Sequence, residues 1–169
     1  MIVRNKIWEE MKQAHANVLC IQWYTDKQRK YERYYQIFIA VVASGGAFGY
    51  LFNSIIPWIT SVAIAFVAVA KSLFPNFLQS EKELLALDGL MDYYNDYMCE
   101  LEHLFYQFDN NIIDEKNAEE NLFKLKKGEC GKESSLNRLI RSIPSRRMKK
   151  NIEQSEEYLN VVYLGNYEQ

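Results

Sequence analysis

Histidine and cysteine are scarce in this chain of 169 residues, which holds two of the first and three of the second. Cys20, Cys99 and Cys130 are odd in number and far apart, with no Cys-x-x-Cys pair, which argues against a disulfide framework or a zinc site. His15 and His103 lie at no metal-ligand spacing, and no phosphate-binding loop or nucleophile elbow is found. We therefore expect no enzyme, no metal and no cofactor.

Charge is missing from one long segment. After Arg33, 37 residues from Tyr34 to Ala70 carry no charged side chain, and Lys71 ends the run. One membrane-spanning helix needs about 20 residues, and two with a short turn need about 40, so the length favours a hairpin. Asn53-Ser54 is typical of a turn, and Pro57 suits the first turn of a second helix.

We place the two membrane passes at Tyr34–Phe52 and Ile56–Phe74. A hairpin buried inside a soluble bundle is the alternative, but neither segment has the polar stripe that a helix of such a bundle shows. Basic residues flank the outer ends of the hairpin and none lies in the turn, so the positive-inside rule predicts that both termini are cytoplasmic.

The apolar run also limits what the hairpin can do. It contains no Asp, Glu, Lys, Arg or His, which argues against a proton relay or a voltage sensor. Two helices cannot enclose a channel, so any pore requires an oligomer. Small and weakly polar residues of the run are candidates to line such a pore or to pack helices of different subunits. Packing inside a single hairpin is the alternative role. These residues are Gln36, Ser44, Gly45, Gly49, Thr60 and Ser61.

Apolar residues recur at alternating spacings of three and four on both sides of the hairpin, which indicates two amphipathic helices. The first stripe is Ile7, Met11, Ala14, Val18 and Ile21, and the second is Leu84, Leu87, Met91, Tyr94, Met98, Leu101, Phe105 and Phe108. A hairpin returns the chain to its starting side, so these stripes should meet. The predicted fold is all-α, a two-helix transmembrane hairpin continued by a cytoplasmic antiparallel helical bundle.

Shorter helices are expected after Asp109–Asn111, which ends the long one. One covers residues 118–127 and stops at Gly128, with Gly131 opening a linker, and the next ends before Pro144. Ser145 is expected to cap a last helix. Its apolar side would hold Met148, Ile152, Leu159 and Val162, with Gly165 after its end.

Six basic residues gather between Ser134 and Ile152, a stretch without an acidic residue: Arg138, Arg141, Arg146, Arg147, Lys149 and Lys150. Guanidinium groups match phosphate oxygens in pairs, so the cluster is a candidate site for a nucleotide or for anionic lipid. Ion pairs with the acidic faces of residues 81–120, or a solvated face, are the alternatives.

This layout resembles the SLATT family, the two-transmembrane effector domains associated with nucleotide-sensing bacterial conflict systems. The resemblance covers nearly the whole chain as one domain, residues 1–169. It includes an amphipathic N-terminal helix within 1–33 that carries Trp8, His15 and Asn17, and the hairpin within 34–74. The cytoplasmic helical region over 75–169 contains the long helix Glu81–Phe108 and C-terminal helices that end in Tyr158-Leu159.

The resemblance implies an oligomer, such as a tetramer, in the bacterial inner membrane that acts in antiviral defence. Its ligand would be a nucleotide or oligonucleotide made by a partner nucleotidyltransferase. We therefore expect a pore or channel gated by a nucleotide-derived signal. A non-conducting membrane anchor that recruits a partner protein is the second reading, and a holin-like lysis protein is the third.

Overall fold

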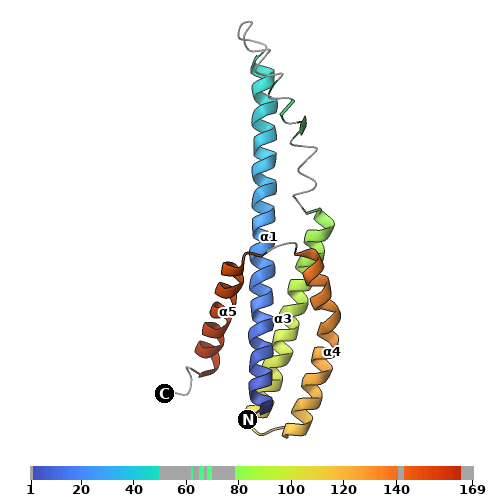
Figure 1. Ribbon diagram of the computed structural model, residues 1–169, viewed down its shortest axis with the longest axis vertical. Coiled ribbons are helices and arrows are strands. Elements are labelled where there is room, and N and C mark those ends of the chain that lie inside the picture. The colour runs from blue at the N-terminus through green and yellow to red at the C-terminus, as the bar shows by residue number, and fades with distance from the viewer. Residues whose placement is uncertain are drawn as a thin grey trace. The chain divides into compact units, whose positions relative to one another are not determined.

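The computed structural model describes residues 2–49, 62, 65–66, 68–69, 79–140 and 143–164, with the backbone alone at 42–49 and 164 (Figure 1). Within these residues the ordered elements are helical and no strand is present, so the all-α prediction is confirmed. The chain divides into two units, one formed by Met1–Tyr24 with Leu85–Gln169 and the other by Thr25–Leu84.

Helix α1 runs without a break from Ile2 to Gly49. The boundary expected between an N-terminal helix and the first membrane pass, at residues 33 and 34, is therefore not a helix end. No proline interrupts this stretch, and its first glycine is Gly45, so no local signal stops the helix there. The predicted stripe is confirmed, since Ile7, Met11, Ala14 and Ile21 are buried and Val18 is half-buried.

Helix α3, Glu81–Asp109, begins with a capping box. The Ser80 backbone N–H donates to Glu83 Oε2 at 2.8 Å, and the Glu83 N–H donates back to Ser80 Oγ at 3.3 Å. The helix ends as predicted, and Asn111 follows with a left-handed φ of 55°. Six of its eight stripe residues are buried and the other two pack against the core.

Helices α1 and α3 meet antiparallel in the first unit. Arg4 Nε donates to Asp109 Oδ1 at 2.7 Å, and Tyr97 Oη donates to Glu10 Oε2 at 3.4 Å, so positions rise along α1 as they fall along α3. The two stripes share one core, which confirms the expected antiparallel pairing.

Helix α4 covers Glu115–Leu139, so the prediction of a short helix over residues 118–127 is wrong. Asp114 caps its start by accepting from the Asn117 N–H at 2.8 Å. The helix passes through Gly128 and Gly131, although an interior glycine costs about 1 kcal/mol relative to alanine. Buried side chains on both sides of the glycines hold it against the bundle: Ala118, Leu122 and Leu136.

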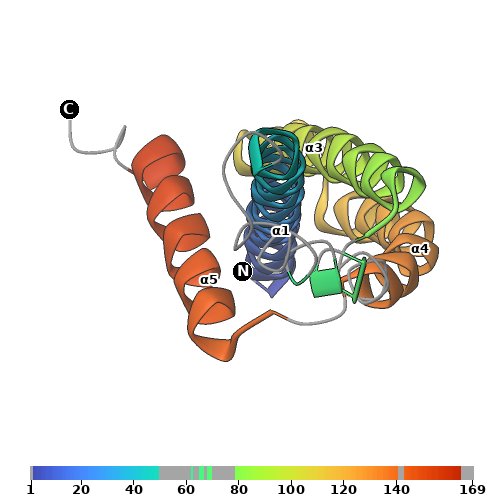
Figure 2. The ribbon, with the colours of Figure 1, turned by 90° about the horizontal axis from the view of Figure 1, so that it is seen from above.

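Helix α5, Ser145–Leu159, continues into a π-helical turn, η2, over Asn160–Leu164. Figure 2 shows α5 on the side of α1 away from α4. Ser145 is not the cap that was expected, because Pro144 occupies the N-cap position and provides no side-chain hydrogen bond. The predicted apolar side is also wrong in part, since the buried positions are Asn151, Ser155 and Leu159, and Met148 is 38% exposed.

Much of the predicted hairpin lies outside the described residues, including the turn at 53–54, Pro57 and most of the second pass over 56–74. Among the residues that are described, no helix combines the length and the apolar character needed to cross a membrane.

Candidate functional site

The predicted basic cluster is divided between two helices. Arg138 is exposed on α4, where its guanidinium donates to Ser135 Oγ at 3.4 Å, and Arg141 lies outside the described residues. Exposed side chains on α5 account for most of the remainder: Arg146, Lys149 and Lys150. Lys149 faces Glu153 at 3.8 Å along its own helix, and this exposed pair adds little to stability.

Helix α5 presents these cations at its N-terminus. Four basic residues lie within 146–150, while the first turn holds no acidic residue and no side chain caps it. The first four backbone N–H groups of a helix have no partner within the helix, and anions bind well at that end. In α5 the Arg147 and Met148 N–H groups already donate to the Pro144 carbonyl, at 2.8 and 3.1 Å. The end of α5 therefore offers a phosphate its basic side chains and, from the backbone, only the N–H groups of Ser145 and Arg146.

Arg147 points inward and differs from its neighbours. Its guanidinium carbon lies 5.6 Å from the centre of the Trp23 ring on α1, a cation–π distance. Its Nε is buried and has no hydrogen-bond partner in the described part of the chain. Arg147 therefore belongs to the contact between α5 and α1 rather than to the exposed basic surface.

A polar interface joins α5 to α1, and sequence reasoning missed it. Asn151 is fully buried, and its Nδ2 donates to Cys20 Sγ at 3.0 Å. Cys20 Sγ also lies 3.6 Å from Met148 Sδ. Burial raises the pKa of the Cys20 thiol, and the nearby Asn151 amide and Arg147 charge oppose that rise only in part. Cys20 is thus an unreactive thiol while α5 covers it.

His15 takes part in the same interface. Its ring stacks on Tyr158, with centroids 4.5 Å apart and planes 11° apart, and Nδ1 lies 3.1 Å from Ser155 Oγ. The single hydroxyl proton of Ser155 is donated to the Asn151 carbonyl at 2.9 Å, so His15 Nδ1 must carry the hydrogen in its bond to Ser155. Burial lowers the pKa of His15, and the charge of Glu102 on α3 opposes this.

The η2 turn anchors the end of the chain that the structure describes. The Tyr163 ring lies 6.3 Å from Trp8 and 5.6 Å from Phe105, both edge-on. Its hydroxyl hydrogen-bonds to Glu102, and burial, with that carboxylate as the next cause, raises the pKa of Tyr163. Trp8 and His15, which carried part of the family resemblance, therefore both lie under the α5–η2 segment, defined here as residues 145–164.

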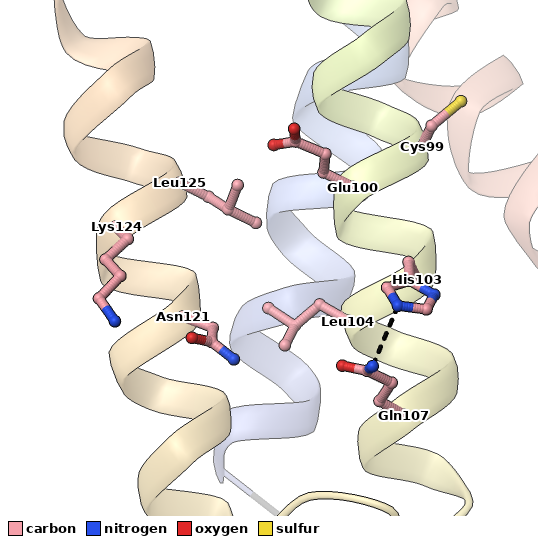
Figure 3. A pocket seen from close by; sticks show the side chains of 8 residues that line it. All are labelled: Cys99, Glu100, His103, Leu104, Gln107, Asn121, Lys124 and Leu125. Carbon is pink, nitrogen blue, oxygen red and sulfur yellow. Dashed lines mark hydrogen bonds between the residues drawn. The ribbon is translucent and has the colours of Figure 1, made fainter.

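A groove of about 550 Å³ lies between α3 and α4 (Figure 3). Leu104 and Leu125 form its apolar part. The remaining lining residues are Cys99, Glu100, His103, Gln107, Asn121 and Lys124. Lys124, the single lysine or arginine among them, already pairs with Glu120 at 3.0 Å, so this groove is poorly suited to a phosphate.

The residues proposed for pore lining or helix packing are only partly described. Gln36 is exposed on α1 and donates to Glu32 Oε1 at 3.3 Å. Ser44, Gly45 and Gly49 lie on α1, whereas Thr60 and Ser61 fall outside the described residues. No group of three histidine, cysteine or carboxylate side chains suited to a metal occurs in the described ranges.

Comparison with protein-family models, with curated proteins and with solved structures finds no match to this chain. The resemblance to the SLATT family therefore stays a prediction.

Proposed function

We propose that the chain is an oligomeric membrane effector of a bacterial antiviral system, and that it forms a pore or channel gated by a nucleotide-derived signal. The observation that carries the membrane part is the charge-free run of 37 residues together with the exposure of its apolar side chains. Ile37, Phe38 and Val41 on α1 are 40–63% exposed, an arrangement that lipid would cover.

The described part of the second pass has the same character. Val62, Phe66 and Val69 are 52–64% exposed. The Phe66 ring lies 6.2 Å from Phe38, edge-on, as expected if the two passes pack together as a hairpin. The antiparallel pairing of α1 with α3 further supports a chain that returns to the side from which it entered the membrane.

The ligand part of the proposal rests on the N-terminus of α5. Arg146, Lys149 and Lys150 are exposed beside a helix end without a side-chain cap. A phosphate placed there would accept hydrogen bonds from guanidinium or ammonium groups and would also lie at the positive end of the helix dipole. Arg147 is left out of this group because it packs on Trp23.

Reconstitution in dye-filled liposomes tests the proposal. The purified protein should release dye, and a nucleotide or oligonucleotide should change the rate of release. The double variant Arg146→Gln, Lys150→Gln should lose the nucleotide effect but keep basal release. The matched control Lys116→Gln, Lys127→Gln removes the same charge from exposed positions on α4 and should respond like the wild type.

The outcomes separate the alternatives. Vesicles that stay tight under every condition, with the protein inserted in the expected orientation, would overturn the pore and favour the membrane anchor that recruits a partner protein. Release that is unaffected by any nucleotide would overturn the gating by a nucleotide signal. Equal losses in the test and control variants would overturn the role of α5.

A further inference from the structure

The contact made by the α5–η2 segment differs in chemistry from the rest of the core. Helices α1, α3 and α4 meet through aliphatic and aromatic side chains, whereas α5 buries two polar residues, Asn151 and Ser155, and one aliphatic residue, Leu159. The hydrophobic effect scales with the apolar area removed from water. The apolar contacts of the α5–η2 segment are mainly those of Leu159 and the Tyr163 ring. Its separation therefore sacrifices less hydrophobic free energy than separation of α1 from α3.

Several features of the docked segment are unfavourable. Asn151 Oδ1 and Arg147 Nε are buried without a hydrogen-bond partner among the described residues, and each such atom carries a desolvation penalty. The charges of α5 also oppose its helix dipole, with cations at 146–150 and acidic residues at 153, 156 and 157. The contacts with α1 and α3 must offset all of these costs.

The contacts that hold the segment are spread along its length. At one end Arg147 lies on Trp23, in the middle His15 bonds to Ser155, and at the other end Tyr163 packs between Trp8 and Phe105. The π-helical turn is a further departure from regular helix, of a kind frequent at functional positions.

We propose that the α5–η2 segment is a latch. It detaches from α1 and α3 as a single unit while the bundle of α1, α3 and α4 stays folded. Opening uncovers Cys20, Trp23 and Trp8. The latch is a conformational device of the fold, and it does not depend on whether the protein forms a pore.

Cys20 provides the test, because it is the buried cysteine and α5 covers it. In a Cys99→Ser, Cys130→Ser background, which removes the two exposed thiols, the rate of Cys20 modification by an aromatic disulfide reagent reports opening. We expect modification at least tenfold faster than global unfolding permits. Below the unfolding transition the rate should rise with urea much less steeply than global unfolding does, because opening exposes only the surface under the α5–η2 segment.

Ser155→Ala removes the bonds to His15 and to the Asn151 carbonyl and should speed Cys20 modification about fivefold to tenfold. Ser135→Ala is the matched control, because Ser135 Oγ donates to the Gly131 carbonyl in the same i−4 pattern but lies on α4. It should leave the rate unchanged. Tyr163→Ala, at the far end of the segment, should also speed modification if the latch moves as one piece.

Three results would overturn the latch. In the first, Cys20 is modified only as fast as the whole protein unfolds, with the full urea dependence. In the second, the two serine variants behave alike. In the third, Tyr163→Ala leaves the rate unchanged, which would limit the motion to α5 alone. Each variant is compared with its own unfolding rate, so a general loss of stability is not mistaken for opening.

Discussion

Replacement of Asn151 by leucine should strengthen the docking of α5. Asn151 is fully buried, with a relative exposure of 0%, and its Oδ1 has no hydrogen-bond partner among the described residues. An unpaired buried acceptor costs about 1–3 kcal/mol. The bond that would be lost, from Nδ2 to Cys20 Sγ, is weak because sulfur is a poor acceptor.

The expected gain is about 1–2 kcal/mol, since leucine shares the branching of asparagine at Cγ and adds apolar burial in place of an amide, which should outweigh the crowding from its larger volume. By the Cys20 modification assay, opening should slow about fivefold to thirtyfold. The control Asn137→Leu, at an exposed position of α4, should change stability by less than about 0.5 kcal/mol. A variant destabilised by more than about 1 kcal/mol would refute this prediction, because it would mean that Oδ1 holds a partner such as an ordered water or that the site has no room for leucine.

Three further predictions concern pH and the membrane. Burial and the charge of Glu10 raise the pKa of Tyr97, so the unfolded chain releases the phenol proton at lower pH than the folded chain does. The free energy of unfolding measured by chemical denaturation should therefore fall above about pH 10, and it should fall less steeply in Tyr97→Phe. The pKa of His15 is lowered from 6.5, so the free energy of unfolding should fall as the pH drops below about 6.5. His15→Gln should make this fall with pH less steep. Glu129, whose pKa is raised, contributes with the opposite sign in the wild type and in the variant alike. Val41→Lys should cost about 3 kcal/mol of insertion and reduce the membrane-bound fraction in flotation, whereas Val161→Lys, on η2, should float like the wild type.

The bundle of α1 and α3 could be predicted because its information is local. A stripe at spacings of three and four specifies both the helix and its buried face, and the Ser80 capping box specifies where α3 begins. The antiparallel pairing then follows from the return of the chain. No distant partner had to be known for any of these steps.

Helix α4 shows where local signals fail. Gly128 and Gly131 read as breaks, but a glycine in a helix costs only about 1 kcal/mol. Side chains near them contribute tertiary contacts that favour the helix: Tyr94 Oη donates to Glu129 at 3.1 Å, and the Lys132 ammonium lies 5.1 Å from the Tyr93 ring centre. Those partners are about 35 residues away in sequence, so a window along the chain cannot include them.

The interface of α5 was missed for a related reason. Asn151 and Ser155 are polar, and their burial depends on what α1 offers opposite them, namely His15 and Cys20. An apolar-face rule therefore selected Met148, which is 38% exposed. The basic cluster was visible as composition, but composition could not show that Arg147 packs on Trp23 while its neighbours face solvent.

If the proposed function holds, the latch and the pore are connected by one helix. Helix α1 carries both Cys20, under α5, and Val41, in the apolar run. A ligand at the N-terminus of α5 can shift opening only by the ratio of its affinities for the docked and free segment. Ser155→Ala should change basal dye release by about fivefold to tenfold, with Ser135→Ala unchanged. The change should follow the direction of the nucleotide effect if the nucleotide binds the free segment more tightly, and oppose it if the nucleotide binds the docked segment more tightly. Basal release equal to the wild type, in a variant whose Cys20 is modified faster, would mean that the latch opens without acting on the pore.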